Sequence, residues 1–465
     1  MQKFIYHIRN YWVNFWSTKD LTKKIIFTLL MLILYVMGTT ITAPFIKVAN
    51  SESIGSNSFL NTLNLIGGGG LRQFSLFALG ISPFINASLI MMILQSRIFP
   101  PLYKMSQSGP QGRRKLNVLT RLLTLVIAYP QAIFLVKSLT TGNNAFIRIV
   151  DSAYGISQTT LVYFVIPMVL TAASLFALFI SEQITNKGVG NGTSLIIFTG
   201  IAARLPFQFR QAFAHYVGSD FDQISASLVG IVNFFTYIVV YLLILLIIAI
   251  VYAAERHIPI QQIGAGRSKS IKEMGFLPIK LNPGGIMPII FAMMVLSFPT
   301  MIVNLLPDEN ASKQWINHNL QFTQPIGFSL LLVIIFAFSL VMGIQQSKVD
   351  KIAEDFAKNS TFIPGVRPGE ETQDYLIAIV FRLSVFSSVF LLILGSMQFI
   401  EIMAGILPSA ISFGGTGLMI LVSVAIETVS QLKARIKSNR LAKAKRESNK
   451  NIESNEVTSV EGLLW

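Results

Sequence analysis

The chain contains no cysteine, and charged residues make up only 13% of its 465 residues. The absence of cysteine excludes disulfide bonds and thiolate metal or redox sites, although it does not identify a compartment. Histidine is also scarce, with four residues, and the chain has no phosphate-binding loop, nucleophile elbow or metal-ligand cluster. The sequence therefore contains no recognisable catalytic site, and we expect a protein that is not an enzyme and needs no cofactor or metal.

Apolar residues, in contrast, are abundant: they make up 52% of the chain, and its mean hydropathy is +0.60. Runs of roughly 20 apolar residues, the length that crosses a bilayer, recur along the sequence. We predict an all-α polytopic membrane protein whose ten spans cover residues 25–42, 74–94, 116–136, 161–181, 193–201, 228–253, 286–305, 326–343, 375–394 and 413–429. The fifth and the tenth are short for independent spans.

Ten spans divide as five and five, and an odd number in each half inverts the second half relative to the first. We therefore predict a cytoplasmic amphipathic lead over residues 1–24, an N-terminal half over 25–225 and a C-terminal half over 226–432. Residues 433–465 follow as a basic cytoplasmic tail, in which we expect the last helix to continue and then to give way to a polar, disordered end.

Lysine and arginine are distributed unevenly between the two sides of these spans. Of the 37 basic residues, 28 lie on the side that holds both termini, seven lie on the other side, and Arg121 and Arg382 lie within spans. Cytoplasmic loops carry the excess of basic residues, so both termini are expected in the cytoplasm. The net charge of +15 is then mostly a consequence of topology and does not require a nucleic-acid partner.

The interiors of the spans are almost free of acidic residues. Glu182 and Glu427 fall at cytoplasmic ends, and Glu401 is expected in an external loop. An ion-coupled solute transporter or a lipid-linked flippase, the alternative with this number of spans, would be expected to hold such groups at depth. Arg121 and Arg382 lie near the cytoplasmic ends of their spans, where we expect them to snorkel to the interface. Asn86 and Gln131 lie in spans two and three and are expected to hydrogen-bond across a helix contact.

Five stretches occur in the order and spacing of one known family. They are LIGGGGLRQFSLFALGISPFINASL, SEQITNKGVGNGTSLIIFTGI, LPIKLNPGGIMPIIFA, FIPGVRPGEETQDYL and FGGTGLMILVSVAIET. Together they resemble the SecY protein-conducting channel of bacteria, over roughly residues 25–432. The resemblance implies two five-span halves around a central pore in the plasma membrane, which conducts secretory polypeptides and opens sideways to lipid between spans two and three and spans seven and eight.

The four consecutive glycines of the first stretch then acquire an expected role. By resemblance, residues 57–66 form a short plug that fills the external funnel and leaves when a polypeptide enters. Glycine tolerates either sign of φ, which suits a segment that must swing. The plug and hinge residues are expected to be Asn57, Phe59, Leu60, Leu63, Ile66, Gly67, Gly68, Gly69 and Gly70.

The family's pore constriction is a ring of aliphatic side chains. Its positions match Ile81, Ile85, Ile197, Ile290 and Ile420 here, while a sixth, usually apolar, is Thr193. A narrow apolar ring resists ions by dewetting, yet it offers no specific bond to a passing chain. Ile81 and Ile85 are four residues apart and share one helix face.

Two long loops, residues 256–280 and 345–374, are expected on the cytoplasmic side, and both mix charged with turn-forming residues. This composition fits a docking site for a soluble partner about as well as it fits a solvated hairpin that only connects two helices. The loops' expected docking residues for a motor or ribosome are Arg256, Arg267, Lys269, Lys272 and Arg367. The resemblance implies a SecA-type ATPase, SecE-type and SecG-type small membrane subunits, and a ribosome as partners, besides substrate polypeptides with signal sequences and membrane lipids.

The chain departs from the family in two places, at Ser82-Pro83-Phe84 and in an arginine-poor loop between spans six and seven. These departures resemble the accessory SecY paralogue of Gram-positive bacteria, which exports serine-rich glycosylated surface proteins. The stretch RPGEETQDYL, in contrast, keeps the pattern of the general form. Taken together, these features favour the accessory form by a narrow margin, and the neighbouring genes would decide between the two forms.

Overall fold

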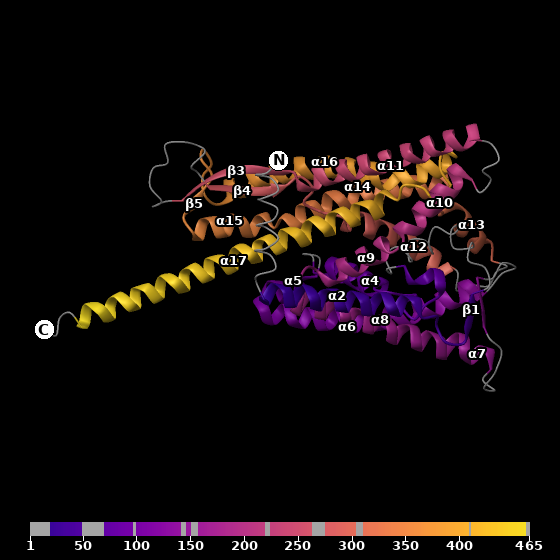
Figure 1. Cartoon of the computed structure of the whole chain (residues 1–465), viewed down its shortest axis with the longest axis horizontal. Helices are drawn as coiled ribbons and strands as arrows, with labels where there is room; N and C mark the ends of the chain where they lie inside the picture. Colours follow the sequence, from indigo (N-terminus) through magenta and orange to yellow (C-terminus); the bar gives the residue numbers. More distant parts are fainter. Residues whose placement is uncertain are drawn as a thin grey trace.

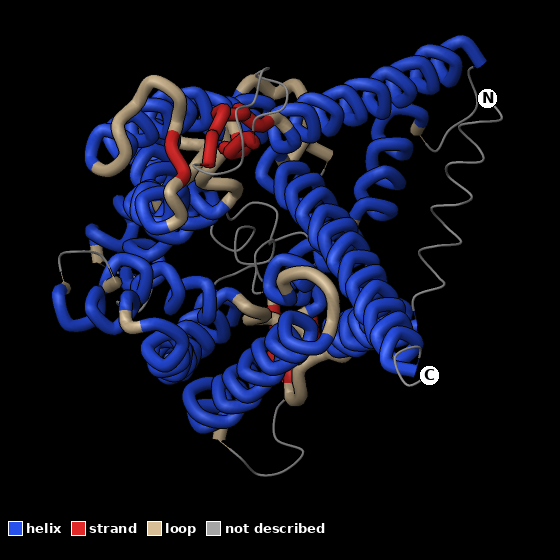
Figure 2. The backbone as a smooth tube through the Cα atoms, turned by 90° about the vertical axis from the view of Figure 1, so that its left-hand side faces the viewer, coloured by secondary structure: helices blue, strands red, loops and turns tan. Residues whose placement is uncertain are grey.

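The computed structural model describes residues 19–48, 69–95, 99–140, 146–149, 157–218, 224–262, 275–303, 310–408 and 411–461. Figure 1 shows two groups of long helices, one drawn largely from each half of the sequence. Figure 2, seen from one end of the molecule, shows that strands occupy only small parts of this helical bundle. The prediction of an all-α fold is confirmed.

The first group of helices comes from the N-terminal half. Its members are α2 (Lys19–Thr40), α4 (Ser82–Leu94), α5 (Pro100–Gln107), α6 (Gly109–Thr140), α7 (Gln158–Thr160), α8 (Ile166–Lys187) and α9 (Gly192–Ala202), with a 3-10 turn η1 (Gly70–Gln73) and a π-helical turn η2 (Leu161–Val165). The next helix, α10 (Leu205–Val217), also comes from this half of the sequence but packs with the second group. Strands β1 (Ile46–Val48) and β2 (Ile147–Ile149) pair antiparallel, with Lys47 opposite Arg148.

The second group comes from the C-terminal half. Its helices are α11 (Ile224–Ala253), α12 (Met287–Val303), α13 (Ala311–Asn319), α14 (Pro325–Ser347), α15 (Val349–Lys358), α16 (Glu370–Met403) and α17 (Gly415–Glu461). Its strands are β3 (Glu255–Gln262), β4 (Gly275–Lys280) and β5 (Thr361–Phe362), which form one sheet in the order β4-β3-β5.

Each of the ten predicted spans coincides with a helix. Within the described residues, seven helical segments are long and apolar enough to cross a membrane, and α4 and α12 are shorter apolar helices. The fifth expected span is α9, which has 11 residues and is followed closely by α10. The chain is therefore a multi-pass membrane protein, as its composition predicts.

The second span differs from its expected bounds of 74–94, because the α-helix begins only at Ser82. Phe74 and Gly80 have φ values of 42° and 50°, in the left-handed region that a right-handed helix cannot contain. Pro83 lies in the first turn of α4, where its missing N–H group costs no helix hydrogen bond. The irregular backbone is paired instead: the Ser174 hydroxyl donates to the Gly80 carbonyl oxygen at 2.8 Å.

The basic helix continuation that we expect after residue 432 is present, because α17 continues to Glu461 and leaves less of the chain for a disordered tail than expected. Its 47 residues span about 70 Å, well beyond a hydrocarbon core of about 30 Å. Residues 418–461 contain no Gly or Pro, and the many Ala, Lys, Arg and Leu residues favour helix. In Figure 1 the far end of α17 projects from the end of the molecule where β3, β4 and β5 lie.

Four buried hydrophobic clusters stabilise this arrangement. One lies within the first group, between the 71–79 segment, α6 and the start of α8. A second lies within the second group, and Ala212 of α10 is part of it, so α10 packs with the helices that follow it. A third joins the two groups, and a fourth lies beneath the sheet of β3, β4 and β5.

Candidate pore and partner-docking surface

The five isoleucines expected in the pore ring lie together in the buried hydrophobic cluster that joins the two groups, called here the central cluster. Ile81 is the N-cap residue of α4, Ile85 lies in α4, and Ile197 lies in α9. Ile290 and Ile420 come from α12 and α17 of the second group. Their exposed fractions range from 0% for Ile81 to 7% for Ile85. The two groups thus meet through a dry apolar contact, and its assignment to a pore stays a prediction.

Polar contacts hold α4 on the side of the first group. Gln131 Nε2 of α6 donates to the Ser82 hydroxyl at 2.9 Å, and Asn86 Nδ2 donates to Gln131 Oε1 at 3.5 Å. The predicted hydrogen bond between Asn86 and Gln131 is therefore confirmed as a contact between helices. These bonds fix the rotation of α4, so that Ile81 and Ile85 are presented to the central cluster.

Thr193, the sixth ring position, uses its hydroxyl at the start of α9. Its Oγ1 donates to Asn191 Oδ1 at 2.8 Å, and the same oxygen accepts the Thr193 backbone N–H at 3.2 Å. Asn191 is the N-cap residue, and such a cap satisfies donors that a helix start leaves unpaired. The hydroxyl is thus already hydrogen-bonded at the helix end.

Of the expected plug and hinge residues, Asn57, Phe59, Leu60, Leu63, Ile66, Gly67 and Gly68 lie outside the described residues. Gly69 and Gly70 are described, and both are closely packed. Gly69 has φ +87°, and a Cβ on Gly70 would lie 2.6 Å from the Phe77 carbonyl oxygen. The Ser75 hydroxyl also donates to the Gly70 carbonyl oxygen at 2.9 Å. In this conformation the second pair of glycines is an anchored turn.

Arg367 lies in the turn before α16, and 87% of its side chain is exposed. Its backbone is fixed from two sides, because its carbonyl oxygen accepts the Thr372 hydroxyl at 2.8 Å and its N–H donates to Glu371 Oε2 at 3.4 Å. The guanidinium lies 3.8 Å from Glu371 Oε1. A rigid turn thus projects an exposed cation.

The two long loops, which are expected to be separate, join in one sheet, and the sequence does not predict this junction. Residues 255–260 of β3 pair with β4 of the same loop, whereas Gln261 and Gln262 pair with Phe362 and Thr361 of β5 in the other loop. Ile258 and Ile260 lie two residues apart between the polar residues His257 and Gln261, and this spacing is the weak signal for a strand there, which Pro259 interrupts. Arg256 is exposed on β3, while Arg267, Lys269 and Lys272 lie outside the described residues.

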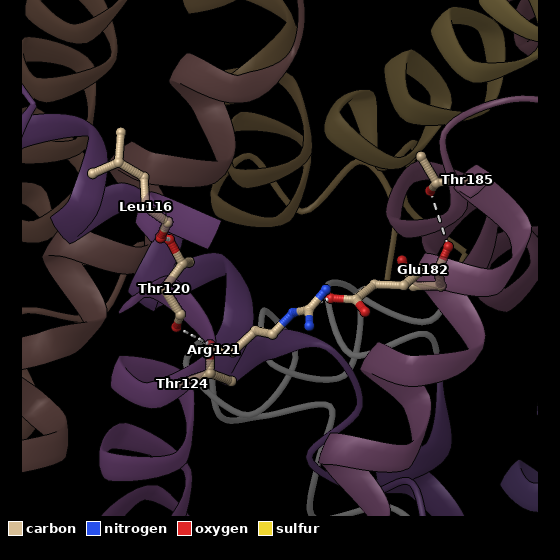
Figure 3. A network of polar contacts seen from close by, with 7 residues as sticks. Leu116, Thr120, Arg121, Thr124, Glu182 and Thr185 are labelled. Atoms are coloured by element: carbon tan, nitrogen blue, oxygen red, sulfur yellow. Dashed lines mark hydrogen bonds and ion pairs between the residues drawn. The ribbon is translucent and has the colours of Figure 1, made fainter. Parts of the chain in front are cut away.

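Arg121 has a partner that the sequence analysis does not predict. Its Nε lies 2.7 Å from Glu182 Oε1, so α6 and α8 share an ion pair near the interface (Figure 3). The Thr185 hydroxyl, one turn further along α8, donates to the Ser181 carbonyl oxygen at 2.9 Å. The Arg121 side chain is 52% exposed, so the pair lies at the surface of the helices, and the expected snorkelling of Arg121 stays a prediction.

These features define a multi-pass helical membrane protein whose two halves close on each other through aliphatic side chains and present a basic loop surface at one end. The sequence model of the SecY family matches residues 75–429. The chain belongs to the SecY family.

Relatives and solved structures agree with this assignment. The chain is 38% identical to the protein translocase subunit SecY of Mycoplasma capricolum, over 96% of this chain and 93% of that protein. It is 35% identical to the protein of the same name from Bacillus subtilis, over 91% of this chain and 96% of that protein. A solved protein-conducting channel superposes with a TM-score of 0.61 at 19% identity, covering 89% of this chain and 92% of its own. Sec61 from a canine ribosome-channel complex does so with a TM-score of 0.57 at 18% identity, covering 89% and 92%.

Proposed function

We propose that this chain is the central channel-forming subunit of the Sec protein translocase and conducts unfolded secretory polypeptides across the bacterial plasma membrane. The observation that carries the proposal is the central cluster, in which Ile81, Ile85, Ile197, Ile290 and Ile420 arrive from both halves of the chain. A constriction of this kind excludes ions by dewetting, and it accepts any polypeptide because it forms no specific bond.

The route by which transmembrane segments leave sideways would lie between the α4/α6 pair and the α12/α14 pair. Ile85 of α4, Ile290 of α12 and Met342 of α14 all belong to the central cluster, so this seam is closed by apolar side chains. Such a contact can part toward lipid at little cost, because lipid tails solvate apolar side chains about as well as protein does.

The cytoplasmic partner would be a SecA-type ATPase or a translating ribosome, docked on the β4-β3-β5 sheet and on Arg367. Support comes from the exposure of Arg367 and from the joining of both loops in one sheet. SecE-type and SecG-type helical subunits would cover part of the apolar outer surface, which includes exposed side chains of α11 such as Phe235 and Leu246. The chain itself would be passive, with the energy supplied by the motor.

Both termini would lie in the cytoplasm, as the uneven distribution of basic residues indicates. A reporter fused after Leu432 tests this arrangement without disturbing the ten spans. We expect a cytoplasmic reporter to be active and an external one to be inactive; external activity would contradict both the span count and the pairing of residues 25–225 with 226–432 as inverted halves.

The plug is proposed for residues 57–66, and the two leading glycines, Gly67 and Gly68, would supply its hinge. Gly69 and Gly70 would mark where the moving segment meets the fixed body, since both are packed against neighbouring backbone. Deletion of residues 57–66 should leave export intact with partial ion leak, because the aliphatic constriction would remain.

Between the two forms of the family, we propose the general translocase. The turn RPGEETQDYL keeps the general pattern, and the relatives named above carry the general name. The accessory form, which the triplet Ser82-Pro83-Phe84 favours, stays a prediction that the neighbouring genes would decide.

Reconstitution tests the proposed function directly. Vesicles containing this chain with SecE-type and SecG-type subunits should protect a secretory polypeptide from added protease only when a SecA-type ATPase and ATP are present. The matched control is Arg367→Glu, which should assemble equally well and protect little. Uptake of a small solute driven by an ion gradient, without any ATPase, would support the alternative of an ion-coupled transporter instead.

A further inference from the structure

Three consecutive residues just before α17 are each held by a different helix. The Tyr237 hydroxyl of α11 donates to the Ile411 carbonyl oxygen at 2.9 Å. Gln208 Nε2 of α10 donates to the Ser412 carbonyl oxygen at 3.2 Å, and the Phe413 N–H donates to Glu401 Oε2 of α16 at 2.8 Å. We call Gln208, Tyr237 and Glu401 the external brace.

The brace is shielded from water. Glu401 is only 8% exposed, although the sequence analysis expects it in an external loop; it lies in the last turn of α16. Tyr237 is 4% exposed, and its ring stacks on Phe413 at a centroid distance of 4.8 Å. Buried hydrogen bonds are costly to leave unmade, and a bond to a carboxylate is stronger than a neutral one. The segment is therefore fixed with respect to three helices at once.

This segment determines where α17 begins. Gly415, the first residue of α17, has no room for a side chain, because a Cβ would collide with the Leu394 carbonyl oxygen of α16. Ile420 follows five residues later, about 7.5 Å along the helix axis. A shift of residues 411–413 would therefore move Ile420 with respect to Ile85 and Ile290 in the central cluster.

We infer that Glu401, with Tyr237 and Gln208, positions the start of α17 so that Ile420 closes the central cluster. The expected effect on ion flow rests on the proposed function. The placement of Ile420 does not, because it can be measured separately. Glu401 is a positioning residue: it acts through the Phe413 backbone and touches no translocating chain in this conformation. Its carboxylate is thus given a role that does not involve ion coupling.

The test uses the absence of native cysteine. In an Ile420→Cys channel the introduced thiol should react slowly with a charged maleimide, because Ile420 is 2% exposed. Adding Glu401→Leu should speed the labelling about tenfold, the change expected when loss of a buried hydrogen bond shifts a two-state equilibrium. Adding Glu401→Gln should restore slow labelling, because the amide oxygen still accepts the Phe413 N–H. If Glu401→Leu fails to accumulate, Tyr237→Phe removes one hydroxyl and keeps the ring, and a smaller increase is expected.

Resting conductance in planar bilayers supplies the second readout. Faster labelling with a raised conductance supports both the brace and the constriction. Faster labelling with unchanged conductance supports the brace and counts against the central cluster as the ion barrier. Unchanged labelling in both Glu401→Leu and Tyr237→Phe overturns the brace, whatever the conductance.

Discussion

Gln261 of β3 and Phe362 of β5 are direct register partners in an antiparallel ladder, although they belong to two loops that lie far apart in the sequence. The sheet rests on a buried cluster that includes Ile258 of the first loop, Ile363 of the second and Leu376 of α16. The two loops and the start of α16 therefore form one mechanical unit, and a partner bound at one loop acts on both.

A cysteine pair tests this junction. Gln261→Cys with Phe362→Cys should form a disulfide rapidly on mild oxidation, because opposed residues of an antiparallel pair have Cα atoms about 4.5–5.5 Å apart, within disulfide range. The chain has no other cysteine to compete. Protease cleavage between the two positions, followed by non-reducing electrophoresis, reads out the bond.

The control is Gln261→Cys with Thr361→Cys, which is out of register and points a thiol to the other face. It should form a disulfide much more slowly. Equal rates for the two pairs would show that the loops are not held in this register.

Reversal of the exposed charge at Arg367 should block motor-driven export. If the proposed partner meets Arg367 with an acidic surface, Arg367→Glu places like charges in contact, which should reduce export about tenfold or more. Arg367→Lys keeps the charge and should retain most activity. Export is measured in vesicles at matched channel abundance, and a fall in abundance as large as the fall in export would identify a structural role for Arg367.

Polar substitution in the central cluster should open the closed channel to ions. Ile85→Asn with Ile290→Asn adds amides that can hydrogen-bond to water in a contact that is now dry. Resting conductance in planar bilayers should rise, and weak signal sequences should be accepted, since less free energy separates the closed and open states. Ile85→Leu with Ile290→Leu conserves volume and should stay sealed. Unchanged conductance in a normally assembled Asn variant would place the barrier elsewhere.

The Arg121–Glu182 ion pair should contribute modestly to stability. Their side chains are 52% and 27% exposed, so the coupling is expected to be about 1 kcal/mol or less. Arg121→Leu should lower the midpoint of thermal unfolding in detergent by a degree or two, and adding Glu182→Leu should recover part of the loss. Arg382→Leu, at an exposed arginine of α16, is the matched control and should change the midpoint less. Strict additivity of Arg121→Leu and Glu182→Leu would show that the pair is not coupled.

The local pattern of the sequence predicts much of this protein, because crossing a bilayer imposes strict demands. Each of the ten apolar runs becomes a helix, since lipid leaves no other way to satisfy the backbone within a span. The bonding of Asn86 to Gln131 also follows, because polar side chains inside spans must find partners. The distribution of basic residues predicts an orientation for the same kind of reason.

The rest depends on contacts between segments that are far apart in sequence. The start of α4 at Ser82 is decided by backbone that Ser174 and its neighbours satisfy, which no local pattern reveals. The pairing of β3 with β5, the ion pair of Arg121 with Glu182 and the burial of Glu401 against Phe413 arise in the same way. Apolar periodicity determines which segments are helices, whereas the meeting of five isoleucines from both halves is decided by how those helices pack in three dimensions.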